Sequence, residues 1–403
     1  RIYNISKDNH TCRELHQEII RPLYLITSLL GLFPYSVKFD KSINLFKVIP
    51  RSIYFNSLCG MSLVLTVLAF LVLHIQEVLI FNENISMTQA IMTQMNYVLE
   101  LINLVIFCTV AYICAFLNRD KYVKVLNMII TTWLDVPRNI KIQSILTRLK
   151  FQVKIVTMVC LLTVCVAQIC VNFSRNDSLW KMTLVVITFD LPQTIQFATL
   201  ALYYALVMMV VAILASINLN CSELAKKGIP LRANEVLEVK TKSITLRQME
   251  LTYVKAFEIK TSLNEAFQGP ILASTIQCFH CIVSESHIIY HGLVIEGSLR
   301  THEVVNCSIW IFYQLMKIYI LAYAGNLLKL EAVKIGQTLH NIPTERQDLR
   351  WLMEIQHFST LMSYQRIEMT VYEYFSLDAT LIYNMLASAM MYLIILVQFD
   401  RRE

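Results

Sequence analysis

Long runs of apolar residues, separated by polar segments, dominate this chain of 403 residues. A helix that crosses a bilayer core of about 30 Å needs roughly 20 mostly apolar residues, because its backbone polar groups must be satisfied within the segment. Seven stretches reach that length or come near it: 53–81, 92–116, 155–171, 182–217, 271–293, 304–328 and 377–399. The pattern predicts an all-α, polytopic membrane protein with seven transmembrane helices.

The positive charges are distributed unevenly among the polar segments. Of the 35 lysines and arginines, 28 fall in four ranges: 1–51, 118–154, 218–262 and 329–350. The segments that alternate with these ranges hold few basic residues, and loops rich in lysine and arginine stay on the cytosolic side of a membrane. The distribution predicts a cytosolic N-terminus and a short external tail after Phe399.

Composition and net charge agree with a membrane protein. Hydrophobic residues make up 56% of the chain and charged residues only 16%, which is more apolar than a soluble fold of this size. The net charge of +6 lies in the predicted cytosolic loops, where it would meet anionic lipid rather than nucleic acid. Cys278 and Cys281 form a lone C-x-x-C inside an apolar stretch and are interpreted as packing residues.

Two segments outside the apolar stretches also show apolar and charged residues at helical spacing. They cover residues 235–266 and 344–372, both on the predicted cytosolic side. The fourth apolar stretch, 182–217, is longer than a bilayer core at about 1.5 Å per residue and should project toward them. These inner helices either pack together as a cytosolic anchor layer or remain solvated connections.

The last apolar stretch carries a stripe of polar and apolar residues. Asn384, Ser388, Met391, Ile395 and Gln398 follow one another at steps of four, three, four and three, so they share one helix face. Such a face suits the wall of a water-filled pore, since polar groups support water and bulky apolar rings exclude it. One helix cannot enclose a pore, so several copies would have to surround an axis. Taken alone, the stripe fits a helix-packing seam better.

The end of this stretch resembles the closing signature of insect gustatory receptors. Residues 391–399, MYLIILVQF, are similar to a motif of Thr-Tyr, five apolar residues and Gln-Phe. Tyr392, Gln398 and Phe399 occupy motif positions, and Met391 replaces the threonine. The GLFP sequence at 31–34, the chain length, the seven predicted helices and the internal N-terminus also fit this family.

This resemblance implies a tetrameric, ligand-gated, non-selective cation channel in the plasma membrane of sensory neurons. In the family, the last helix of each subunit lines a central pore, and an apolar residue three before the motif glutamine closes it. Carried onto this chain, Ile395 would be the gate, Gln398 the polar ring beside it, and Asn384, Ser388 and Met391 would line the pore. The implied partners are a small-molecule tastant, permeating cations, membrane lipids, and either identical subunits in a homotetramer or sister receptors in a heteromer.

The same resemblance divides the chain by role. Residues 1–51 are expected to be a cytosolic N-terminal segment, and the six-helix ligand-binding bundle is expected within 52–328. The anchor helices are expected at 218–270 and 329–372, and the pore-lining helix with its outer tail at 373–403.

A ligand that enters from outside should bind among the outer halves of the second to sixth helices. Three polar clusters fall at about that depth, each on one helix face: Asn96, Tyr97, Glu100 and Asn103; Asp190, Gln193 and Gln196; and Trp310, Tyr313, Gln314 and Lys317. Ionisable groups at membrane depth are costly and tend to face a partner or a cavity. The clusters predict a pocket for a small organic tastant, an ion pair of Lys317 with Glu100 or Asp190 that neutralises buried charge, or both.

Neither a metal nor a cofactor is expected. His287 and His291 have a spacing found in zinc sites, and His280 and Glu285 lie in the same stretch, but no third ligand is evident. They are interpreted as core or rim residues. The sequence Asp190-Leu191-Pro192 predicts a kink in the fourth helix, because proline lacks a backbone donor.

Other functional classes fit less well. An enzyme is not expected, since the sequence contains no phosphate-binding glycine loop or nucleophile elbow. A secondary transporter would usually show paired repeats or broken helices, and a G-protein-coupled receptor would have an external N-terminus. A sugar such as fructose and a bitter compound both remain open as the tastant, because Leu393 stands where family members that bind sweet sugars often have glutamate.

Overall fold

The computed structural model describes ten segments and one single residue: 21–32, 35–40, 45–50, 53–80, 87–136, 140–174, 179–226, 235–295, 297, 301–342 and 349–400. Within them the chain is mostly helical, as the apolar pattern predicts. The first helices are α2 (Arg21–Leu29), α3 (Ile53–Ile80), α4 (Met87–Leu117), α5 (Arg119–Asp135), α6 (Ile140–Ser174) and α7 (Leu179–Val185). The later ones are α8 (Leu191–Lys226), α9 (Glu235–Tyr290), α10 (Thr301–His340), α11 (Leu349–Tyr364) and α12 (Ala379–Asp400), with π-helical turns η2 (Val186–Asp190) and η3 (His291–Ile295).

Six helical runs in the described part of the chain are long and apolar enough to cross a membrane. They are Leu58–Glu77, Met95–Leu117, Leu179–Lys226, Thr245–Val294, Glu303–His340 and Ala379–Gln398. The third predicted stretch, 155–171, lies in α6, which is not one of the six. The structure therefore bears out a polytopic helical protein, and the seventh spanning helix stays a prediction.

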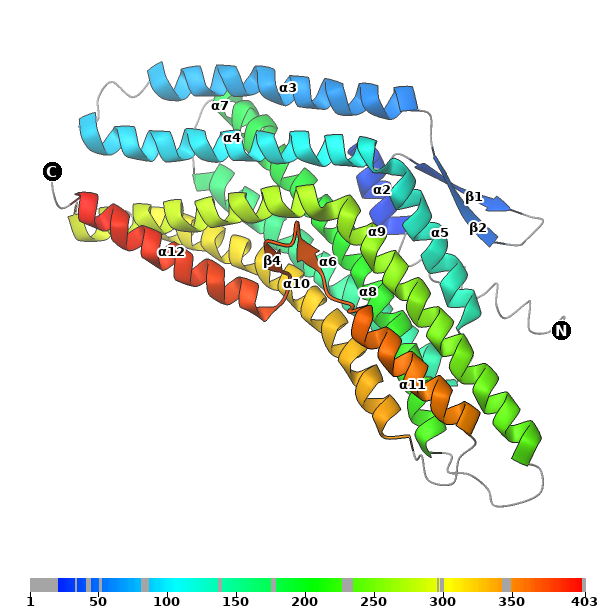
Figure 1. The fold of residues 1–403 in the computed structure, drawn as a ribbon. Coiled ribbons are helices and arrows are strands. Elements are labelled where there is room, and N and C mark those ends of the chain that lie inside the picture. The colour runs from blue at the N-terminus through cyan, green and yellow to red at the C-terminus, as the bar shows by residue number, and fades with distance from the viewer. Residues whose placement is uncertain are drawn as a thin grey trace.

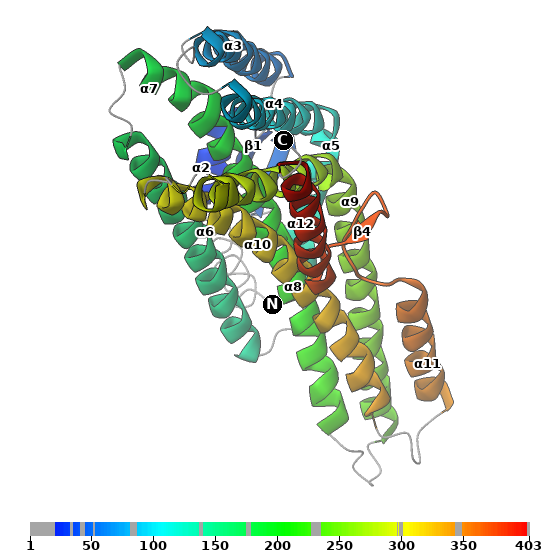
Figure 2. The same cartoon turned by 90° about the vertical axis from the view of Figure 1, so that its left-hand side faces the viewer.

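Helix α8 occupies the centre of the bundle, with α4, α6, α9 and α10 packed around it (Figures 1 and 2). Of the most apolar window in the run Leu179–Lys226, 94% is buried inside the chain, against 17% of the window in Ala379–Gln398. Small buried residues on α8 let the neighbouring helices approach closely, as is usual for helix packing in membranes: Ala198, Ala201, Ala205 and Ala212. The bundle is therefore organised around a helix that meets almost nothing but protein.

The predicted irregularity of the fourth helix lies at its proline. The turn η2 ends at Asp190, and α8 begins at the next residue with Pro192 in its first turn. Proline has no N–H and its ring crowds the carbonyl four residues earlier, which is that of Thr188 in η2. A wide π-turn accommodates both effects without ending the helix.

The predicted inner helices are longer or shorter than expected. The segment 235–266 does not form a separate helix, because α9 continues through Pro270 into the fifth apolar stretch as one helix of 56 residues. The segment 344–372 was expected to be one helix, but α11 ends at Tyr364. Residues 343–348 and the Phe33-Pro34 half of GLFP lie outside the described residues.

Two small hairpins, which the sequence did not predict, accompany the mostly helical fold. Strands β1 (Tyr35–Asp40) and β2 (Leu45–Pro50) pair antiparallel with Tyr35 opposite Pro50. Strands β3 (Thr370–Val371) and β4 (Phe375–Ser376) pair with Val371 opposite Phe375. The second hairpin replaces the expected end of the 344–372 helix, and Asn264 of α9 accepts a hydrogen bond from the Thr370 N–H at 3.3 Å. This long-range bond leaves no periodic signal in the sequence.

The N-terminal part of α9 and the C-terminal part of α10 lie beside α11 (Figures 1 and 2). The ring of Tyr253 on α9 packs against Phe358 of α11 with centroids 5.7 Å apart, and its hydroxyl donates to the Gln365 carbonyl at 2.9 Å. The Thr338 hydroxyl of α10 donates to Asn218 of α8 at 2.7 Å. These contacts favour packed inner helices over separate solvated connections.

The start of α12 touches α10 through backbone atoms. Gly325 of α10 lies so close to Leu377 that a Cβ built on the glycine would stand 1.8 Å from the Leu377 carbonyl oxygen. The next residue, Asp378, caps α12 by accepting from the Thr380 N–H at 3.0 Å and from the Thr380 hydroxyl at 2.5 Å. The Lys329 ammonium of α10 donates to the other Asp378 oxygen at 3.1 Å. Helix α12 is thus fixed to α10 at its first residues.

The contact at Gly325 predicts that Gly325→Ala destabilises the protein by about 1–3 kcal/mol, because the methyl group forces α12 away from α10. The control is Gly336→Ala on the same helix, where a Cβ would meet only the Met362 Cε at 3.9 Å. That change should be neutral or stabilising, since alanine is the better helix former. Thermal unfolding of the purified proteins in one detergent measures both. Equal stability of the two variants would contradict the backbone contact.

The cap of α12 predicts a pH dependence of stability. Hydrogen bonds from the Thr380 hydroxyl and backbone, and from Lys329, lower the pKa of Asp378 from 3.8 to about 2. A carboxyl with a depressed native pKa stabilises the fold above its unfolded pKa, and this contribution, here about 2 kcal/mol, is lost as the pH falls from about 4 to about 2. Asp378→Asn should remove that part of the acid destabilisation, measured by thermal unfolding against pH.

Asp135→Asn provides the control for this experiment. The Asp135 carboxylate pairs with Lys255 on the surface, where its side chain is 53% exposed. Its loss should therefore leave the acid limb of the stability curve nearly unchanged. An acid limb of the same size in wild type and Asp378→Asn would refute the assignment to the cap.

Candidate functional site

The Lys317 side chain of α10 lies at the centre of a buried polar cluster. Its ammonium donates to the side-chain oxygens of Gln196 at 2.6 Å, Gln277 at 3.3 Å and Gln193 at 3.4 Å. The nitrogen also lies 4.7 Å from the centroid of the Tyr313 ring, which favours the cation. Lys317 is only 5% exposed, so these neutral groups replace its hydration. Lys317 therefore hydrogen-bonds to three glutamines, whereas the ion-pair interpretation expected a pair with Glu100 or Asp190.

Helix α9 contributes side chains to this cluster that the sequence analysis missed. The Gln196 amide donates to the Ser274 hydroxyl at 2.9 Å and to the Gln277 oxygen at 3.2 Å. The Cys278 thiol donates to Gln314 of α10 at 3.3 Å. Ser274, Gln277 and Cys278 follow one helix face at steps of three and one, but such neutral residues within a long apolar stretch give a weak signal. The structure thus brings α8, α9 and α10 together at one point.

Aromatic rings form one side of the cluster. Trp310 packs edge-on against Phe189 of η2 with ring centroids 5.0 Å apart, and against Tyr313 at 5.7 Å. Both Trp310 and Tyr313 are buried. Their spacing of three residues on α10 places them on the face of Lys317, as the sequence predicts.

Among the predicted residues of α4, Tyr97 contacts a histidine that the sequence analysis did not select. The Tyr97 hydroxyl lies 3.3 Å from His74 Nε2, and His74 Nδ1 lies 2.6 Å from the Thr188 hydroxyl of η2. Asn96 and Asn103 are half-buried, whereas Asp190 is buried beside Pro192. His74 links α3 to α4 and η2, so it belongs to the polar lining of this end of the bundle.

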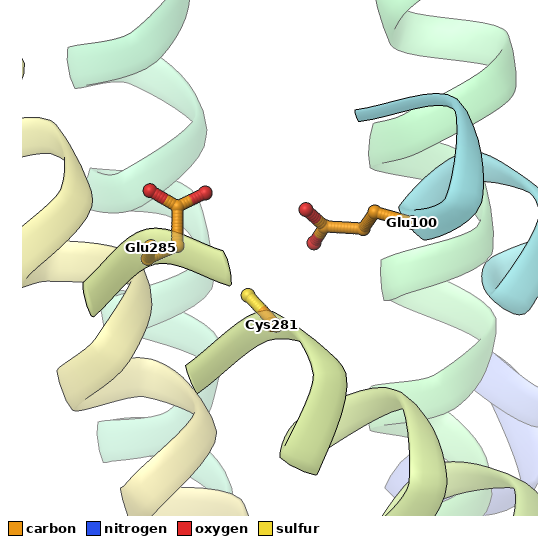
Figure 3. A group of neighbouring side chains, drawn as sticks. All are labelled: Glu100, Cys281 and Glu285. Atoms are coloured by element: carbon orange, nitrogen blue, oxygen red, sulfur yellow. The ribbon is translucent and has the colours of Figure 1, made fainter. Parts of the chain in front are cut away.

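Glu100, also on α4, faces α9. Figure 3 shows its carboxylate directed toward Glu285 and Cys281, and the possible ligand atoms of the three residues lie within 4.8 Å of one another. Such a group is able to hold a metal ion. The zinc-like pair selected from the sequence is different: the rings of His287 and His291 stand 6.0 Å apart, tilted at 43°, one turn further along the chain. His280 is half-buried on the same helix.

Two cavities lie near these side chains. The first, of about 30 Å³, touches Tyr313 and Lys317 and has room for about one water molecule. The second is an open, apolar groove of about 470 Å³ between α6 and α10, lined by Leu162, Val166, Val304, Val305, Ser308, Ile309 and Phe312. Only the second is of a size suited to a small organic ligand. In this conformation the polar cluster is closed and the groove beside it is open.

The stripe on α12 faces away from the chain. Asn384, Ser388, Met391, Ile395 and Gln398 are all exposed, Met391 to 68% and Ile395 to 45%. An adjoining face, formed by Leu381, Met385 and Ala389, is buried against the bundle. The stripe is therefore not a packing seam within one chain, although it can still meet another copy or lipid.

The motif tyrosine connects α12 to α9. The ring of Tyr392 packs edge-on against Phe279 with centroids 6.4 Å apart. Phe279 lies between Cys278 of the polar cluster and Cys281 of the carboxylate group. A shift of α9 at the polar cluster would reach α12 through this contact. The side chain of the motif residue Phe399 lies outside the described residues.

The cluster around Lys317 predicts that Lys317→Met destabilises the protein by about 3 kcal/mol, because three buried glutamine oxygens lose their donor. The control is Lys121→Met. Lys121 pairs with Glu265 at 2.6 Å, but both side chains are more than 40% exposed, so the loss should stay below about 1 kcal/mol. Thermal unfolding of the purified variants measures the difference, and equal losses would argue against the cluster as a structural centre.

Comparisons with known proteins place this geometry in a family. No curated protein matches the chain by sequence. Its fold is similar to that of the insect olfactory receptor OR5 from Machilis hrabei, with a TM-score of 0.70 and 11% identity over 94% of this chain and 97% of the other. The structure of that receptor with eugenol gives a TM-score of 0.72 and 11% identity over 97% and 100% of the two chains. The family described as 7tm Chemosensory receptor matches residues 20–403, so the chain belongs to this family of multi-pass membrane chemoreceptors.

Proposed function

We propose that this chemoreceptor is a gustatory receptor that acts as a tetrameric, ligand-gated, non-selective cation channel. The observation that carries the proposal is the exposed stripe on α12, which includes the polar residues Asn384, Ser388 and Gln398. An exposed polar stripe is costly against lipid, but it suits a water-filled path shared by several copies. The resemblance of residues 391–399 to the gustatory signature supports the same assignment.

In this proposal four α12 helices surround the pore, and Ile395 closes it. The exposed isoleucine side chains would meet at the axis and exclude water, while Gln398 would form a polar ring one turn away. Opening would move the helices apart until the ring of isoleucines becomes wet. Cations would then pass mainly with their water, which agrees with low selectivity.

The contacts of α12 suggest how a ligand would act on the gate. At its first residues, α12 is fixed to α10 by Gly325 and by the pairing of Lys329 with Asp378. Further along, it touches α9 through the contact of Phe279 with Tyr392. A ligand that separates α9 from α10 near Lys317 would therefore move the middle of α12 relative to its fixed start.

The ligand would enter through the apolar groove between α6 and α10. The groove holds Phe312 next to Tyr313, whose ring contacts the buried ammonium of Lys317. A small organic tastant with one polar end would fill the groove and compete for the glutamine hydrogen bonds of Lys317. A bitter compound with an apolar body meets this description, whereas a sugar such as fructose, with hydroxyl groups all around it, would depend on the glutamines and Lys317 rather than on the groove. A panel of both applied to cells that express the chain alone distinguishes them.

The proposed gate predicts that Ile395→Ala gives several-fold more cation current without ligand, because a smaller side chain leaves the narrowest ring wet. The control is Ile394→Ala, whose side chain is similarly exposed, 54% against 45%, but points away from the stripe. Whole-cell recordings at matched surface expression measure the current. Ligand-evoked current that is unchanged by substitution of both Ile395 and Gln398 would refute the pore assignment.

A further inference from the structure

Glu100 of α4 and Glu285 and Cys281 of α9 form a group with the chemistry of a metal site. Cys281 and Glu285 are four residues apart, so they lie on one helix face, and Glu100 approaches from the opposite side (Figure 3). The three possible ligand atoms lie within 4.8 Å of one another. Small side-chain movements would bring all three to one ion, since zinc ligands stand about 2.0–2.3 Å from the metal.

One oxygen of the Glu100 side chain is left without a hydrogen-bond partner in this group. This side chain is 4% exposed, and its Oε1 atom has no hydrogen-bond partner in the described part of the chain. The Cys281 thiol, itself fully buried and free of a disulfide, lies within 4.8 Å of a Glu100 carboxylate oxygen. A buried carboxylate oxygen without a donor is costly, and it is directed at the position where an ion would lie.

The buried cation Lys317 directs its hydrogen bonds away from this group. The three donors of the Lys317 ammonium are directed to oxygens of Gln193, Gln196 and Gln277. Lys317 still acts on Glu100 and Cys281 through its charge. With Cys281 as a thiolate and both glutamates ionised, the group carries three negative charges. The positive charge of Lys317 offsets one of them, so two negative charges remain uncompensated.

From this geometry we propose that Glu100, Cys281 and Glu285 bind a zinc ion that joins α4 to α9. A divalent ion balances the two remaining negative charges, and the protons held by the Cys281 thiol and the buried Glu100 carboxyl leave to solvent on binding. Calcium and magnesium prefer oxygen ligands alone, and an organic ammonium would make little use of a thiol, whereas zinc binds thiolate and carboxylate together. Three protein ligands leave a fourth position for water, which suits an ion that exchanges.

Neighbouring side chains would support the ligands. Cys307 of α10 lies beside Glu285, and Gln314 lies beside Cys281. Such outer contacts hold metal ligands in position. Since Phe279, two residues before Cys281, packs on Tyr392, a bound ion would also hold the part of α9 that contacts α12. The site itself does not depend on the proposed channel function, because zinc binding is measured without ligand or current.

The test uses the purified full chain in detergent with zinc alone. Isothermal titration should give one zinc ion per chain, and cobalt in its place should show the charge-transfer absorption of a cobalt–thiolate bond. Cys281→Ser should abolish that band and weaken zinc binding by more than about 100-fold, because loss of a ligand exceeds the 10- to 100-fold cost of an outer-shell change. Glu285→Gln, which keeps the shape of a half-buried side chain, should also weaken binding.

Cys221→Ser is the matched control, since this thiol is equally buried but lies on α8, where it contacts the Met249 sulfur at 3.6 Å. It should keep both the cobalt band and the affinity for zinc. Thermal unfolding confirms that each variant is folded. Folded wild-type protein that binds no zinc, or a cobalt band that survives Cys281→Ser, would overturn the proposal. Binding lost in Glu285→Gln but kept in Cys281→Ser would also overturn it, by indicating a site made of carboxylates alone.

Discussion

The burial of α8 is the constraint on which the rest of the structure depends. A helix enclosed by other helices must satisfy its polar groups with protein, because neither water nor lipid can reach them. Gln196 near its start meets this requirement through Lys317 and through Gln277 and Ser274 of α9. The Gln193 oxygen accepts from Lys317, whereas the Gln193 amide nitrogen has no partner in the described part of the chain. The polar cluster is therefore part of what sets the positions of α9 and α10 around α8.

The same arrangement leaves α12 at the edge. One face of α12 packs on α9 and α10, and the other, which carries the polar stripe, has no partner within the described chain. At its start, the close approach of Gly325 and the cap by Asp378 fix its direction. A helix fixed at its first residues and exposed along the stripe is suited to assembly with copies of itself, and the proposed channel rests on this feature.

The sequence predicted much of this fold, and the failures have physical reasons. Length and apolar periodicity identified the long helices, and helical spacing placed Trp310, Tyr313 and Lys317 on one face, because both signals are local. Helix α9 continues as one helix through Pro270, and the second hairpin is bonded to Asn264. Both features depend on contacts between distant residues, so no local pattern reveals them. The carboxylate and thiol group was missed for the same reason, since Glu100 lies on another helix than Cys281 and Glu285.

The central claim is that the stripe on α12 lines an axis shared by four copies. An experimental structure of the full chain in lipid nanodiscs, determined by electron microscopy, tests it most directly. The account predicts a four-fold assembly in which Ser388, Met391 and Ile395 of every subunit face the axis. A single chain, or an assembly in which these side chains face lipid, would contradict it.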